Sequence, residues 1–168
     1  MMQKLRFFRY LAYSIEILVF FVLGSTPLLL PEIFGATPCF LIALALTIAV
    51  FENEVPAMMF GVACGVLTDL GFSNSIGLFT ISLAIVCFIL GFCANNFIAA
   101  NFYNVMLTAV IVITALLTLH FVFAFVIKGY DNAGVYYVNH YISRIVQTIL
   151  CTAVFYFMNK FVYETLND

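Results

Sequence analysis

Four ionisable side chains interrupt long apolar stretches of this sequence: Glu16, Asp69, His120 and Arg144. Inserting a charged side chain at the centre of a membrane helix costs about 2.5 to 3.5 kcal/mol of free energy. Each of these residues is therefore expected to have an interaction partner within the protein. A carboxyl or imidazole in such a place can form an ion pair, hold a proton or bind a ligand. Their roles therefore depend on the elements that carry them.

The composition is that of a membrane protein. Hydrophobic residues make up 65% of the 168 residues and charged residues 8%, whereas a soluble domain has roughly 45 to 50% apolar and about 25% charged residues. The net charge of -2 offers no basic surface for nucleic acid. Metalloprotease, hydrolase and phosphate-loop motifs are absent from the sequence, so we expect no enzyme, no cofactor and no metal site.

Six apolar segments have the length and composition of membrane spans, which require about 20 mainly apolar residues. They predict an all-α, polytopic integral membrane protein in which residues 1–168 form one compact bundle: 7–27, 36–51, 55–71, 76–93, 104–127 and 142–162. The second to fourth segments are short, so five spans remain an alternative. Basic residues followed by an apolar run also begin a signal peptide, but Glu16 interrupts this run and no cleavage site follows.

The basic residues predict the orientation. With six spans both termini share one side, and that side holds Lys4, Arg6, Arg9 and Lys160. The other side holds Lys128 and Arg144. Because Lys and Arg are enriched on the cytoplasmic side, we expect both termini in the cytoplasm.

The six-span path places Asp69, His120 and Arg144 toward one face of the membrane. An ion pair between Asp69 and Arg144 is one prediction, with His120 beside it. In the alternative, Asp69 accepts hydrogen bonds from the open N-terminus of the fourth helix, or from Ser73 to Ser75, and clamps a helical hairpin. The sequence leaves both open.

The remaining polar residues have structural and functional interpretations. Glu16 either reaches toward Lys160 or the interface, or forms a proton or substrate site. His120 is expected to be a hydrogen-bonded packing residue, because no second ligand stands at metal-binding spacing beside it. The cysteines contain no Cys-x-x-Cys pair and are expected to be free thiols: Cys39, Cys64, Cys87, Cys93 and Cys151.

Two glycines and Asp69 form one stripe on the third predicted helix. Gly61, Gly65 and Asp69 are spaced by four residues, which places them on the same helical face. Small residues at this spacing allow two helix backbones to approach closely. The stripe therefore serves either packing within the bundle or docking of a separate chain.

The stretch GVACGVLTDLGFSNSIG, from Gly61 to Gly77, resembles the signature region of the MreD family of bacterial rod-shape-determining membrane proteins. The resemblance implies a fold similar to the six-helix substrate-binding component of energy-coupling-factor transporters. It also implies a non-enzymatic scaffold subunit of the cell-wall elongation (rod) complex in the bacterial cytoplasmic membrane. In that complex Gly61, Gly65, Asp69 and Gly77 would shape a docking face or the adjoining hairpin.

The same resemblance implies the partners. They are a single-span MreC-like protein, the RodA glycosyltransferase with its transpeptidase, and an MreB-like filament, besides membrane lipid. The alternative function is a vitamin-type binding component of an uptake transporter. It requires a polar pocket, which Asp69, His120, Arg144 and Asn139 would line.

Overall fold

The chain folds as an all-α membrane protein. The computed structural model describes residues 2–26, 37–72, 77–96, 101–123 and 133–165, and these residues contain no strand. Within these ranges five helices are long and apolar enough to cross a membrane, which makes this a multi-pass membrane protein. They are α1 (Met2–Ser25), α3 (Glu54–Phe72), α4 (Leu78–Asn96), α5 (Phe102–Phe121) and α7 (Ile142–Thr165). Helices suit these segments because lipid offers no hydrogen bonds to the backbone, so each segment must satisfy its own polar groups.

A sixth helix, α2 (Phe40–Phe51), lies at the centre of the bundle and differs from the others. All its residues from Leu41 to Val50 are buried, and it contacts α1, α3, α4, α5 and α7. A helix that is apolar on every side is expected in such a place. Its 12 residues extend only about 18 Å at 1.5 Å per residue. The helix is therefore shorter than the predicted span over 36–51 and shorter than a hydrocarbon core, which is about 30 Å thick.

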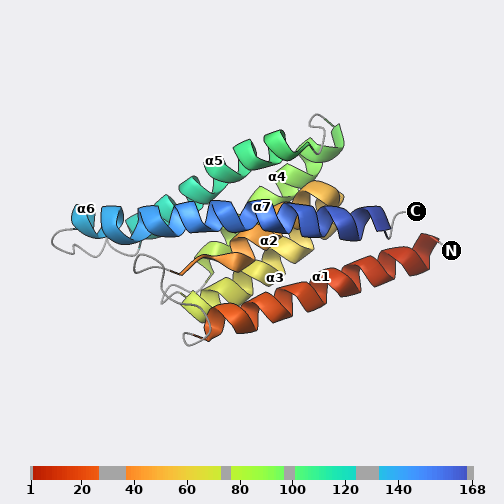
Figure 1. Ribbon diagram of the computed structural model, residues 1–168, viewed down its shortest axis with the longest axis horizontal. Helices are drawn as coiled ribbons and strands as arrows, with labels where there is room; N and C mark the ends of the chain where they lie inside the picture. The colour runs from red at the N-terminus through yellow and green to blue at the C-terminus, as the bar shows by residue number, and fades with distance from the viewer. Residues whose placement is uncertain (1, 27–36, 73–76, 97–100, 124–132, 166–168) are drawn as a thin grey trace.

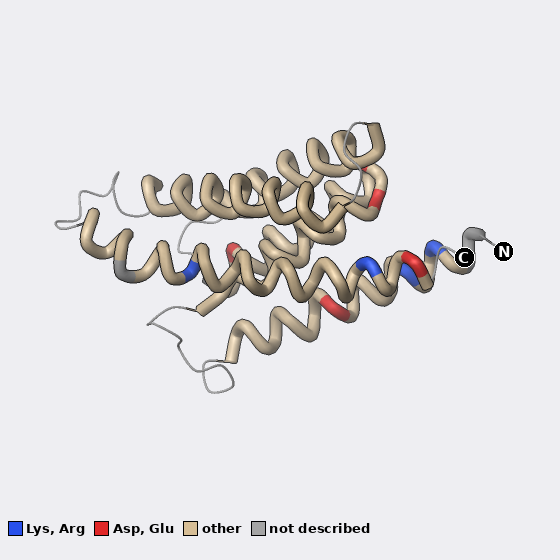
Figure 2. The backbone as a smooth tube through the Cα atoms, turned by 45° about the horizontal axis from the view of Figure 1, so that its top comes forward, with Lys and Arg blue, Asp and Glu red and all other residues tan. Residues whose placement is uncertain are grey.

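The helices run between two ends of the bundle. α1 begins and α7 ends at the same end (Figure 1), which we call the terminal end. At the opposite, far end, α7 is preceded by the short α6 (Ala133–Tyr136) and the π-helical turn η2 (Tyr137–Tyr141). Most of the charged residues gather toward the terminal end, and long uncharged stretches lie between the two ends (Figure 2).

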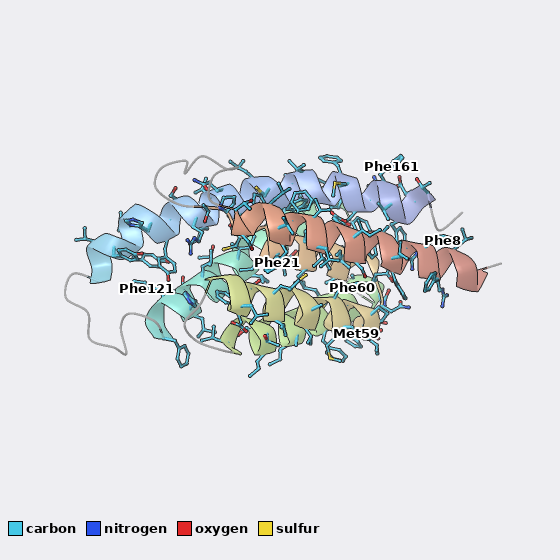
Figure 3. The ribbon with its side chains drawn as sticks, turned by 90° about the horizontal axis from the view of Figure 1, so that it is seen from below. Phe8, Phe21, Met59, Phe60, Phe121 and Phe161 are labelled. Atoms are coloured by element: carbon cyan, nitrogen blue, oxygen red, sulfur yellow. The ribbon has the colours of Figure 1, made fainter. Side chains whose placement is uncertain are left out.

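The outer faces of the helices are apolar. Phe8, Met59 and Phe161 point away from the bundle (Figure 3) and are 57%, 65% and 70% exposed. In a multi-pass membrane protein such faces meet lipid. Phe60, by contrast, packs edge-on against the rings of Tyr10 and Tyr13 and so joins α3 to α1.

Candidate functional site

Helices α3 and α4 form a closely packed hairpin that depends on glycine. A Cβ atom added at Gly65 would lie 2.5 Å from the Cα of Thr80 and 3.0 Å from the carbonyl oxygen of Phe79. A Cβ at Gly61 would lie 2.8 Å from the Cβ of Cys87. Any side chain at these positions would therefore force the two backbones apart.

The hairpin has a third close approach nearer the terminal end. A Cβ at Gly91 of α4 would lie 3.0 Å from the Cβ of Ala57 and 3.0 Å from the Cα of Glu54. Gly91 was not predicted from the sequence, because it has no glycine partner at a spacing of four. The face that carries Gly61 and Gly65 is filled by α4 of the same chain. Of the two roles expected for the stripe, the structure places these glycines in packing within the bundle.

Asp69 caps the N-terminus of α4. Its Oδ2 accepts hydrogen bonds from the backbone N–H of Gly77 at 3.1 Å and of Thr80 at 3.0 Å, and from the Thr80 hydroxyl at 2.6 Å. Its Oδ1 accepts the N–H of Phe79 at 3.2 Å. A carboxylate is well placed here because the first N–H groups of a helix have no intrahelical partner and the helix dipole is positive.

Gly77 enables this cap through its backbone. Its φ angle is +97°, a left-handed conformation that side chains disfavour. In this conformation its N–H reaches Asp69, while its carbonyl accepts the N–H of Ile81 at 3.1 Å. Gly77, the last glycine of the stretch that resembles the MreD signature, thus forms the turn directly before α4.

The ion pairs among the described residues do not join Asp69 to Arg144. They join Arg9 to Glu52 and Lys160 to Glu164. Arg144 is half-buried at the start of α7. The clamp from α4 backbone groups is the arrangement that the structure shows for Asp69. Ser73, Asn74 and Ser75, the other expected donors, lie outside the described residues.

His120 lies in an aromatic cluster at the far end. Its ring stacks on Phe79 with centroids 4.9 Å apart, and its Nδ1 lies 2.9 Å from the hydroxyl of Tyr141. Burial raises the pKa of Tyr141 to about 12, so the phenol keeps its proton. Because Phe79 also donates its N–H to Asp69, one residue joins the cap to the cluster. His120 and Asp69 are therefore both at the far end, as the six-span path predicted.

A buried ion pair at the terminal end was not predicted. The Nε of Arg9 lies 2.6 Å from Oε1 of Glu52, with side chains 7% and 1% exposed. The Arg9 guanidinium also lies 4.9 Å from the centre of the Tyr163 ring. Burial raises the pKa of Glu52, and the Arg9 charge opposes this rise. The pair ties α1 to the end of α2.

Glu16 and Lys160, the other expected partners, do not form an ion pair in the described part of the chain. Lys160 lies 3.7 Å from Glu164, and both side chains are exposed. Glu16 is 9% exposed in the middle of α1. All five cysteines are free, and Cys39, Cys64 and Cys87 are buried. Within the described ranges no cluster of three His, Cys, Asp or Glu side chains could hold a metal ion.

An open apolar groove runs along the outer side of α5. It has a volume of about 670 Å³. The described residues that line it belong to α5, with Val122 directly after it: Val110, Ile111, Thr114, Ala115, Thr118, Leu119 and Val122. The groove lies within the membrane-spanning stretch Phe102–Phe121 and reaches just past it at Val122. A group that enters the groove would therefore meet mainly apolar side chains at bilayer depth.

In these features the described side chains pack helices against one another and cap the start of α4. The Asp69 carboxylate and the His120 imidazole are both engaged by neighbouring groups of the fold. Comparison of the chain with protein-family models, with curated proteins and with solved structures gives no match.

Proposed function

We propose that this protein is a non-enzymatic scaffold subunit of the bacterial cell-wall elongation complex, as its resemblance to MreD implies. It would lie in the cytoplasmic membrane with both termini in the cytoplasm and bind the single membrane helix of an MreC-like partner. Contact with RodA, its transpeptidase and an MreB-like filament would be direct or through that partner. The observation that carries the proposal is the open apolar groove on the membrane-spanning α5.

The groove has the side chains that a membrane helix needs for close approach. Thr114, Ala115 and Thr118 are small and lie along one side of α5. Small residues at helix interfaces in lipid let the backbones approach and gain van der Waals contact. The Thr118 hydroxyl lies 2.9 Å from that of Tyr137, so it does not require a polar group from the partner. A mainly apolar helix is therefore a suitable occupant.

The hairpin of α3 and α4 has a structural role in this proposal and is not the docking surface. Its glycines are used within the bundle, so it stabilises the scaffold instead of contacting the partner. α5 lies at an edge of the bundle (Figure 1), where a second chain can reach it. This moves the proposed docking surface from Gly61 and Gly65 to α5.

The uptake-component alternative has less support. Asp69 accepts hydrogen bonds from the start of α4, and His120 is stacked on Phe79 and bonded to Tyr141. A ligand that used these two groups would have to displace those contacts. The side chain of Asn139, also expected in that pocket, lies outside the described residues.

The experiment is co-purification with a co-expressed MreC-like protein in mild detergent. Ala115→Leu fills the groove, and Ala63→Leu makes the same change at an exposed position of α3. We expect the partner to be lost at least tenfold from Ala115→Leu and to be retained by Ala63→Leu, with both variants monodisperse. Equal partner recovery from both variants would contradict docking on α5, and no binding to the wild type would contradict the proposed function.

A further inference from the structure

Glu16 brings a carboxyl into the middle of α1. It lies within the membrane-spanning stretch Leu5–Ser25 and is 9% exposed. Its Oε1 is buried and has no hydrogen-bond partner in the part of the chain that the structure describes. Three residues earlier, Tyr13 is 0% exposed, and its hydroxyl oxygen likewise has no partner among the described residues. Two polar atoms on one face of α1 are thus buried in the bundle with no hydrogen-bond partner among the described residues.

The charged groups near Glu16 do not neutralise it. Helices α2, α3 and α7 pack against α1. Among the described titratable groups, the Cys64 thiol of α3 and the Tyr13 phenol of α1 are close enough to Glu16 to interact with it electrostatically. Arg9, nearly two turns away on the same helix, is held by Glu52 at 2.6 Å.

The described titratable groups of the other two helices interact electrostatically with Tyr13 instead. They are Glu52 at the end of α2 and Tyr163 of α7. Lys160, the cation of α7 expected to reach Glu16, lies 3.7 Å from Glu164. Within the described ranges, no ion pair therefore includes Glu16.

A carboxylate in apolar surroundings without a counter-charge costs several kcal/mol. A carboxylic acid costs only the desolvation of a neutral polar group. We propose that Glu16 is a proton-binding site inside the membrane, where the packed bundle holds it as a neutral carboxylic acid. This inference does not depend on the partner proposed for α5.

Infrared difference spectroscopy tests the protonation state directly. The spectrum of the wild type minus that of Glu16→Gln, both purified in detergent at neutral pH, should contain the carbonyl band of a protonated carboxylic acid. Glutamine has nearly the same shape as the neutral acid, so the variant should fold. The matched control is Glu164→Gln, which removes an exposed carboxylate. Its difference spectrum should contain carboxylate bands, and carboxylate bands for Glu16 as well would overturn the proposal.

The pH dependence of stability supplies a second test with a defined sign. If the folded bundle keeps the proton that the unfolded chain loses above about pH 4.3, the unfolded state binds fewer protons and stability falls as pH rises. The wild type should therefore lose stability relative to Glu16→Gln toward alkaline pH. An ionised and paired Glu16 would give the opposite slope, and that result would also overturn the proposal.

Discussion

Asp69 and Thr80 fasten two helices together. Both the N–H and the hydroxyl of Thr80 donate to Oδ2 of Asp69, at 3.0 and 2.6 Å. One turn earlier on α3, Gly65 allows the Cα of Thr80 to approach so closely that a Cβ there would lie 2.5 Å away. The cap and the glycine contact therefore depend on the same separation of α3 and α4.

Removal of the Asp69 carboxylate should destabilise the hairpin. Asp69→Ala leaves the N–H groups of Gly77, Phe79 and Thr80 without their acceptor. We expect a loss of about 1.5 to 3 kcal/mol, the value of a hydrogen bond to a charged group. Thr80→Val removes only the hydroxyl and should cost about 1 kcal/mol. Reversible unfolding in mixed detergent measures both, and an Asp69→Ala variant as stable as Thr80→Val would contradict the cap.

A side chain at Gly65 should separate the helices. Gly65→Ala is expected to cost about 1 to 3 kcal/mol, as overpacking of a filled interior does, and Gly65→Leu more. Ala63→Leu, two residues away on an exposed face, is the control and should be nearly neutral. Detergent melting curves report the difference. Equal melting temperatures for Gly65→Leu and Ala63→Leu would show that α4 does not pack on this face.

Because Arg9 and Glu52 form a buried ion pair, a second substitution at Glu52 should restore much of the stability lost on replacing Arg9. Arg9→Met leaves the Glu52 carboxylate, 1% exposed, without its counter-charge. Breaking a buried pair in this way costs about 3 to 5 kcal/mol. Adding Glu52→Gln should recover much of that loss, because the remaining side chain is neutral. The double variant is compared with both single variants by detergent unfolding, and strictly additive losses would argue against the pair.

The hydrogen bond between His120 and Tyr141 can be measured by a double-mutant cycle. His120→Phe preserves a ring against Phe79, and Tyr141→Phe removes only the hydroxyl. We expect a coupling free energy of about 0.5 to 1.5 kcal/mol, the usual net value of one hydrogen bond. The four proteins of the cycle are unfolded in the same detergent mixture. A coupling free energy near zero would contradict the hydrogen bond between His120 and Tyr141.

The membrane class and five long helices follow from the sequence because length and apolar composition determine which segments can span a bilayer. The same criterion could not predict how short α2 is or how deeply it is buried. An apolar run does not reveal whether it faces lipid or protein, and the helix begins only at Phe40, after Pro38. Buried on all sides, α2 needs no bilayer-spanning length.

The sequence likewise predicted which residues of the site share a helical face, but not what covers that face. Spacing of four placed Gly61, Gly65 and Asp69 on one face, but it left open whether α4 or another chain covers that face. The pair of Arg9 and Glu52 joins residues 43 positions apart, and Glu52 falls between two predicted spans. Only the packing of α1 against α2 brings them together.

Photocrosslinking at Ala115 is the most direct test of docking on α5. A photoreactive amino acid is placed at Ala115 in the groove or at the exposed Ala63 as the control, and the protein is irradiated in the membranes of a rod-shaped bacterium. We expect a covalent adduct with a single-span MreC-like protein from position 115 and lipid adducts alone from position 63. Lipid adducts alone from both positions, with the partner present in the same membranes, would contradict the account.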